Sequence, residues 1–131
     1  MGTPTINLIR KTLNQFPSIK LAIIFGSIAS NRETPYSDID LAILTNTLID
    51  TKQKIQMIEA LATATGRTID LIDLRAAGQP LLGQIISNGT RILGNDAEYA
   101  RLITKNLFDQ ADFLPYRNRI LDERRQAWIS K

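Results

Sequence analysis

Apolar runs alternate with amphipathic stretches along most of the chain. Short, β-rich apolar runs predict strands over residues 19–25, 38–44 and 68–74, and a shorter fourth strand is predicted over 90–93. Between them, apolar residues recur at helical spacing over 50–65 and 79–88, and Gly66 and Gly89 stand where these helices would end. The apolar face of the first of these helices is expected to carry Ile55, Ile58, Leu61 and Ala62. Strands separated by helices predict an α/β (α+β) domain, with a small mixed sheet flanked by helices.

Helical patterns also flank this predicted core. Thr3-Pro4 is typical of a helix start, and the apolar residues that follow keep helical spacing as far as Phe16, just before Pro17. Residues 28–37 are polar and predict a short helical turn and then a loop. After the last strand, 98–113 and 116–129 are helical by pattern. We expect 1–95 to be the core and 96–131 a C-terminal helical segment of the same domain, because no long linker separates them.

Composition narrows the available chemistry. The 131 residues include no Cys and no His. Without Cys, the chain can have no disulfide framework, no thiolate zinc site and no cysteine nucleophile. Without His, it lacks the commonest general base. Catalysis would have to use carboxylates, hydroxyls, Lys or Arg, together with a hard metal ion. With no signal-peptide pattern and no apolar run of about 18 residues, we expect a cytoplasmic protein with no membrane contact.

The net charge of +3 is unevenly distributed. Acids and bases balance as far as Asp112, and the surplus comes from the last 19 residues. Such a basic segment could contact nucleic acid or an acidic protein surface, or it could be the solvated face of a helix. The solvated face is favoured, because the surplus is small. Few aromatic residues are interleaved with the charges, unlike in proteins that bind single-stranded nucleic acid. No direct contact with nucleic acid is therefore expected.

Two carboxylates on one predicted strand suggest a metal site. Asp38 and Asp40 are two residues apart, so on a strand they would point to the same face, with roughly 6.5 Å between their Cα atoms. Ile39 would point the other way, into the core. Carboxylate oxygens are the ligands that Mg²⁺ prefers, usually one or two carboxylates with substrate phosphates. The pattern D-I-D thus predicts one wet acidic face and one apolar face.

Gly26-Ser27 ends the first predicted strand and offers a complementary site. Glycine lets the backbone approach a ligand closely. Backbone N–H groups and a hydroxyl at the start of a helical turn can hold a phosphate. Taken singly, a D-x-D is more often an exposed edge, and a Gly-Ser is more often only a turn. Ser27 is also no hydrolase nucleophile, because G-x-S-x-G and a His partner are both absent. In combination the two halves favour metal-assisted phosphoryl or nucleotidyl transfer.

The spacing of these residues resembles a known signature. Gly26-Ser27, ten intervening residues and then Asp38-Ile39-Asp40 match the G-S-x10-D-x-D signature of the DNA polymerase beta-like nucleotidyltransferase superfamily. The short chain is similar to its minimal members, and the resemblance covers roughly residues 19–93. It implies the nucleotidyltransferase fold, ATP as the substrate and two Mg²⁺ ions. It also implies that Gly26 and Ser27 bind the triphosphate.

The resemblance also implies a third carboxylate. Asp70 and Asp73 are three residues apart, so on a strand they would face opposite sides. The family pattern places this acid soon after a Gly-Arg turn, which favours Asp70, and Asp73 is then expected to be a loop or capping carboxylate. Asp38, Asp40 and Asp70 would be the catalytic metal ligands. Asp70 would also assist deprotonation of the incoming hydroxyl.

One position departs from the family pattern. Family members often carry Arg-Gly where this chain has Ser30-Asn31. The basic contact to the triphosphate would therefore come from Arg32 or from elsewhere in the chain.

The minimal branch includes antitoxins of HEPN-type ribonuclease toxins. By resemblance, the chain would add AMP from ATP to a tyrosine of such a toxin and form a hetero-oligomer with it. We expect the C-terminal helices to be the docking surface. Trp128 could either contact the partner or pack in the core. Leu102 and Phe108 are expected in the core.

Three alternatives remain at this stage. One is adenylylation of a small hydroxylated molecule, as in aminoglycoside-modifying relatives, and another is a binding module that only masks a toxin. The third, template-independent RNA extension, is not expected, because it would need an RNA-binding domain and no segment of these 131 residues resembles one.

Overall fold

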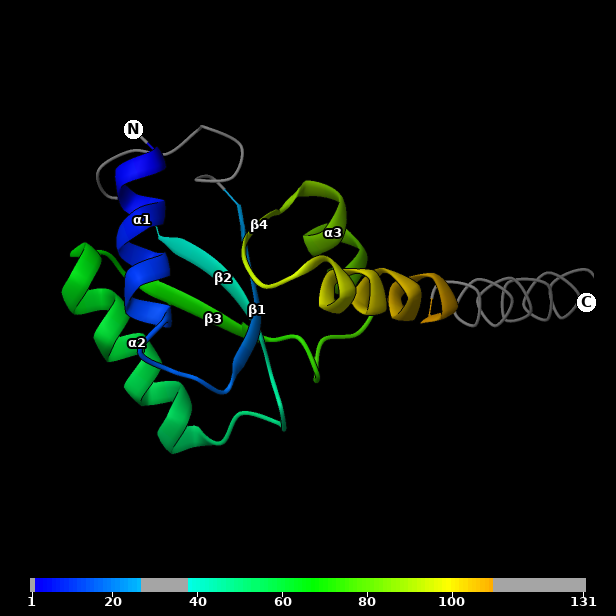
Figure 1. The fold of residues 1–131 in the computed structure, drawn as a ribbon, viewed down its shortest axis with the longest axis horizontal. Coiled ribbons are helices and arrows are strands. Elements are labelled where there is room, and N and C mark those ends of the chain that lie inside the picture. The colour runs from blue at the N-terminus through cyan, green and yellow to red at the C-terminus, as the bar shows by residue number, and fades with distance from the viewer. Residues whose placement is uncertain (1, 27–37, 110–131) are drawn as a thin grey trace, which may run out of the picture.

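The computed structural model describes residues 2–26 and 38–109. Their elements are, in order, α1 (Gly2–Leu13), β1 (Ile19–Phe25), β2 (Ile39–Thr45), α2 (Thr51–Thr65), β3 (Ile69–Asp73), α3 (Leu81–Asn88) and β4 (Thr90–Leu93). Residues 96–109 are helical (Figure 1). The predicted turn and loop over 28–37 and the predicted helix over 116–129 lie outside the described residues.

The four strands form one mixed sheet in the order β3-β2-β1-β4. β1 pairs antiparallel with β2 and with β4, whereas β2 and β3 run parallel. A parallel neighbour needs a crossover connection, and α2 supplies it. The predicted mixed sheet flanked by helices is therefore confirmed, with all four strands within one residue of their predicted bounds.

Helices cover both faces of the sheet (Figure 1). On one face, α1 and α2 pack through Ile9, Leu13, Met57 and Leu61 against alternate residues of the strands. On the other face, α3 and the helical segment 96–109 contribute a second buried cluster, whose helical members are Leu82, Ile85 and Leu102. Residues of β1, β2 and β3 alternate between the two clusters, apart from a register shift near the start of β1, whereas β4 contributes Ile92 to the first cluster. The sheet is thus the middle layer of a three-layer domain.

The ends of α2 follow the predicted pattern. The Asp50 carboxylate accepts a hydrogen bond from the backbone N–H of Gln53 at 2.7 Å, and the Gln53 side chain accepts one from the Asp50 N–H at 3.4 Å. This reciprocal capping box satisfies two otherwise unpaired N–H groups. At the other end Gly66 has φ +68° and donates its N–H to the Ala62 carbonyl. The expected glycine cap is confirmed there.

Some details of the helices differ from prediction. α1 begins at Gly2 and ends at Leu13, so Thr3 lies inside the helix and not at its cap. In α2, Ile55 was expected on the apolar face, yet it is 50 % exposed and Met57 is buried instead. Local spacing could not separate these two positions, because the sheet decides which side of a helix is buried. Gly89 does follow α3, but with φ −84° it needs no left-handed backbone.

The helical segment 96–109 is attached to the core near its start. Leu102 is buried in the second cluster, as predicted, and Tyr99 packs against that cluster. Arg91 of β4 lies over the Tyr99 ring, 4.8 Å from its centroid, and forms an ion pair with Asp96 at 2.7 Å. Phe108, expected in the core, is 68 % exposed, so that prediction is wrong. Its part of the segment projects past the sheet, where no described strand can cover it.

Within the described ranges, no helix is long and apolar enough to cross a membrane.

Candidate active site

Asp40 and Asp70 are neighbours across two parallel strands. β2 and β3 pair in a register that sets Asp40 opposite Asp70, close enough for the charge of Asp70 to act on Asp40. Along each strand the adjacent residues belong to the first apolar cluster, so both carboxylates point to the opposite face. The two strands therefore deliver one acid each to the same place, at the start of β2 and β3.

Burial and repulsion act together on Asp40. Burial raises its pKa above the ordinary aspartate value, and the negative charges of Asp70 and Asp38 raise it further. Asp38 is exposed and immediately precedes β2. Three carboxylates thus influence one another electrostatically at this edge. A cation bound between them would relieve that repulsion, because it stabilises the charged forms.

Gly26 lies against this acidic pair. β1 pairs with β2 so that Phe25 is opposite Asp40, and the next residue, Gly26, turns with φ +76°. A Cβ atom at Gly26 would overlap Asp40 Oδ2 and stand 3.1 Å from its Cγ. Only glycine fits both the left-handed backbone and the space beside the carboxylate. From the sequence, the Gly-Ser turn and the D-I-D strand were described as two separate halves of a site. In the structure Gly26 and Asp40 are in direct contact.

Asp73 faces the other side of β3 and is used structurally. One carboxylate oxygen accepts the N–H of Ile49 and the other accepts the N–H of Arg75, both at 2.9 Å. Its carboxylate thus ties together the loops that follow β2 and β3. This is the loop-capping role expected from the sequence, and it leaves Asp70 as the acid of β3 that meets Asp40.

The donor set suits a hard divalent cation. Asp40 and Asp70 offer carboxylate oxygens side by side, and Mg²⁺ is commonly held by one or two carboxylates with phosphate oxygens completing the shell. The described residues contain no assembled group of three or more acidic, His or Cys side chains able to hold a metal by themselves. Asp38 acts on Asp40 through its charge. A cation here would therefore share its ligands with a bound phosphate.

Two residues of the predicted site, Ser27 and Arg32, lie outside the described residues. Their predicted contacts with the triphosphate stay predictions. Of the predicted site, the structure brings together Gly26, Asp40 and Asp70, with Asp38 alongside.

Comparisons with known proteins agree with this geometry. The model of the family described as "Polymerase beta, Nucleotidyltransferase" matches residues 7–98. The protein adenylyltransferase MntA of Shewanella oneidensis is 26 % identical over 116 residues, which cover 88 % of this chain and 84 % of that protein.

Solved structures extend the likeness. A chain in the crystal structure of a toxin–antitoxin with AMP-PNP has a TM-score of 0.80 at 28 % identity, covering 90 % of this chain and 96 % of that one. A chain in the complex of tri-AMPylated Shewanella oneidensis HEPN toxin with MNT antitoxin has a TM-score of 0.77 at 27 % identity, covering 94 % and 98 %. The likeness thus spans the sheet, both helical layers and the carboxylate edge.

Proposed function

This chain belongs to the polymerase beta nucleotidyltransferase family, and from that membership we propose that it transfers AMP from ATP to a tyrosine hydroxyl of a HEPN-type toxin and serves as its antitoxin. The observation that carries the proposal is the placement of Gly26 directly against the paired carboxylates Asp40 and Asp70. Two similar solved structures support the acceptor class, since they are described as a toxin–antitoxin with AMP-PNP and as a tri-AMPylated toxin with its antitoxin.

In this proposal the turn at Gly26-Ser27 receives the triphosphate. Gly26 lets the backbone turn pass directly beside the Asp40 carboxylate, because a Cβ atom there would collide with that carboxylate. Ser27 and Arg32 supply the hydroxyl and the positive charge that the sequence assigns to them. Asp38, Asp40 and Asp70 hold Mg²⁺, two ions by family resemblance. A bound metal ion would neutralise the negative charge of the phosphates and orient the reacting groups for in-line transfer.

The transfer itself is an in-line substitution at the α-phosphorus. The acceptor oxygen forms a bond to that phosphorus while the bond to the bridging oxygen breaks and pyrophosphate leaves. The hydroxyl proton passes to Asp70. Asp70 is the more exposed of the paired acids, so an incoming hydroxyl can reach it. With no His in the chain, a carboxylate is the natural base.

We further propose that residues 1–95 form the catalytic core and that 96–131 belong to the same domain. The burial of Leu102 in the second apolar cluster supports the continuity. The exposed Leu107 and Phe108 offer apolar surface on the same helical segment. We propose that this surface contributes to toxin docking, together with Trp128 and its neighbours, which lie outside the described residues.

The test is intact mass spectrometry of a HEPN toxin incubated with this chain, ATP and Mg²⁺. We expect the toxin to gain the mass of one or more AMP groups. The gain should disappear with EDTA and with Asp70→Asn, and it should survive Asp73→Asn, the matched acid on the other face of β3. A stable complex without any gain in mass would instead favour the masking module. If the chain modified an aminoglycoside but not the toxin, the favoured function would be adenylylation of a small hydroxylated molecule.

A further inference from the structure

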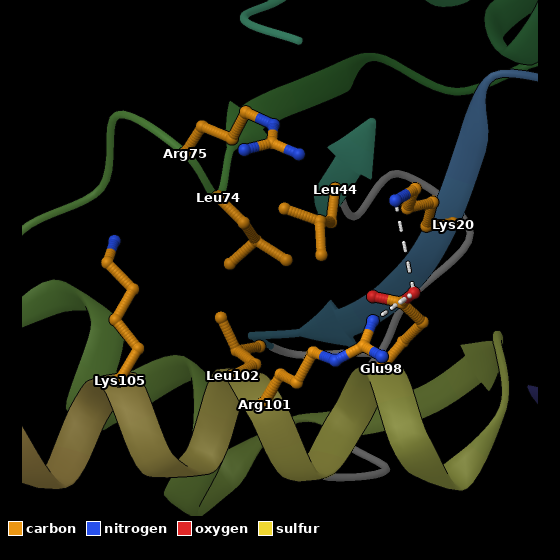
Figure 2. Close-up of a pocket in the computed structure, with 8 residues that line it drawn as sticks. All are labelled: Lys20, Leu44, Leu74, Arg75, Glu98, Arg101, Leu102 and Lys105. Carbon is orange, nitrogen blue, oxygen red and sulfur yellow. Dashed lines mark hydrogen bonds and ion pairs between the residues drawn. The ribbon is translucent and has the colours of Figure 1, made fainter. Parts of the chain in front are cut away.

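A hollow lies on the same face of the sheet as the carboxylates but at its other end. Its floor is formed by Leu44, Leu74 and Leu102, which come from β2, the loop after β3 and the helical segment 96–109 (Figure 2). It encloses about 370 Å³. Small-molecule sites usually enclose roughly 300–1,000 Å³, so the volume suits a compact ligand. We call this hollow the basic pocket, for the charges described next.

Cations surround the leucine floor. Lys20, Arg75, Arg101 and Lys105 line the basic pocket, and Glu98 is its one acidic lining residue in the described chain. Glu98 lies 2.9 Å from Arg101 and 3.9 Å from Lys20, so its charge is already engaged. The lining therefore keeps a positive surplus, although Asp and Glu nearly balance Lys and Arg over the whole chain. A positive hollow with an apolar floor favours an amphipathic anion.

The side chains of two of these cations form no ion pair within residues 2–26 and 38–109. They are Arg75 and Lys105, and Figure 2 shows Lys105 on the opposite side of the leucines from the Lys20–Glu98 pair. Arg75 is held in place, because its Nε donates to the Thr45 carbonyl at 2.7 Å. Its two Nη groups then remain to bind a ligand. A guanidinium fork suits phosphate or carboxylate oxygens, which it can bind bidentately.

The basic pocket is separate from the proposed transfer site. Lys20 precedes Phe25 by five residues on β1, and Leu44 follows Asp40 by four residues on β2. At about 3.3 Å per strand residue, the two sites are roughly 13–17 Å apart. A ligand in the basic pocket would therefore not occupy the space beside Asp40.

We propose that the basic pocket binds a small amphipathic anion. Arg75 and Lys105 hold one phosphate or carboxylate group, and an apolar body covers Leu44, Leu74 and Leu102. A small molecule fits better than a peptide, because cations from three separate chain segments converge on one confined hollow. The inference does not depend on the proposed toxin chemistry.

The experiment is a ¹H–¹⁵N NMR titration of the full chain, without Mg²⁺, using three probes: octyl phosphate, AMP and inorganic phosphate. We expect octyl phosphate or AMP to shift the amides of Leu44, Arg75 and Leu102 saturably. Saturation by AMP would identify a nucleotide-type ligand, and saturation by octyl phosphate a lipid-type ligand. Inorganic phosphate should bind at least about tenfold more weakly, because it leaves the leucine floor uncovered.

The variant Lys105→Glu should raise the Kd of the bound probe at least about tenfold, through loss of one charge-assisted contact and added repulsion. Lys105 is exposed, so this change spares the fold. Lys54→Glu is the matched control, since Lys54 is an exposed lysine of α2, on the other face of the sheet. No saturable shift at the pocket amides, equal affinity for inorganic phosphate, or a Kd unchanged by Lys105→Glu would each overturn the proposal.

Discussion

The backbone of Gly26 lies against the carboxylate of Asp40, so close that a Cβ atom at Gly26 would overlap Asp40 Oδ2. The contact follows from the pairing of β1 with β2, which sets Phe25 opposite Asp40 and turns the next residue over the acid. It joins the end of one strand to the start of another. Any bulk at Gly26 must therefore move the acid that the proposed chemistry depends on.

Gly26→Ala should lower the rate of nucleotide transfer at least about a hundredfold. It should also lower the free energy of unfolding. The left-handed backbone alone costs alanine about 1 kcal/mol, and displacement of Asp40 adds to it. Gly66→Ala is the matched control, because Gly66 has a similar φ of +68° with open space around its Cα. That variant should lose only about 1 kcal/mol and keep its activity. Urea unfolding and an AMP-transfer assay would measure both, and equal activities of the two variants would contradict the steric argument.

Asp40→Asn should make the protein more stable while removing its activity. The pKa of Asp40 is raised by burial and by Asp70 and Asp38, so the folded state holds the Asp40 proton to higher pH than the unfolded state does. Ionisation of Asp40 therefore costs stability as pH rises through its folded pKa, and the loss is complete above it. Asparagine removes this charge. We expect the Tm in EDTA at neutral pH to rise by about 2–4 °C.

Glu59→Gln is the control for that experiment. Glu59 is an exposed acid of α2 with no ion pair among the described residues, so its neutralisation should leave the Tm within about 1 °C. A fall in the Tm of Asp40→Asn would show that the ionised Asp40 stabilises the fold. That result would contradict the prediction that burial and repulsion make this charge destabilising.

Asp70 and Asp73 should give opposite results when each is replaced by Ala. Asp73→Ala removes the acceptor of the N–H groups of Ile49 and Arg75, which should cost about 2 kcal/mol. Its transfer activity should remain within a fewfold of normal. Asp70→Ala should keep or raise stability, because it relieves repulsion on Asp40, and should lose activity by at least about a hundredfold. Thermal unfolding and the AMP-transfer assay would separate the two, and the reverse order would assign the site to Asp73.

Sequence reasoning could predict the strands from local periodicity, which also sets Asp70 and Asp73 on opposite faces of their strand. The choice of Asp70 as the metal ligand came from the resemblance to the family pattern. The alternation of Ile69, Asp70 and Leu71 identifies a buried strand with one polar residue on its other face. It could not predict that Gly26 touches Asp40, since that requires knowing the register of β1 on β2. The exposure of Ile55 and Phe108 was missed for a related reason: burial depends on what packs over a helix face, and a single element does not encode it.

The basic pocket was missed because its lining is scattered in sequence. Lys20, Arg75 and Lys105 are separated by at least 30 residues from one another, and each alone resembles an ordinary surface cation. Only the sheet order and the helical segment 96–109 bring them around one floor.

Substitutions of Leu102 and Phe108 would separate two proposed roles of the helical segment 96–109, packing in the core and docking of the toxin. Leu102 is 4 % exposed in the second apolar cluster, so Leu102→Ala should cost about 2–4 kcal/mol through lost burial and a cavity. Phe108 is 68 % exposed, and Phe108→Ala should change stability by no more than about 0.5 kcal/mol. If the segment docks a HEPN toxin, Phe108→Ala should instead weaken the complex at least about tenfold, because exposed aromatic residues are common interface anchors. Urea unfolding and calorimetric titration would measure the two effects, with Lys52→Ala on α2 as a surface control. An unchanged toxin affinity would remove Phe108 from the docking surface, and a large loss of stability would place it in the core after all.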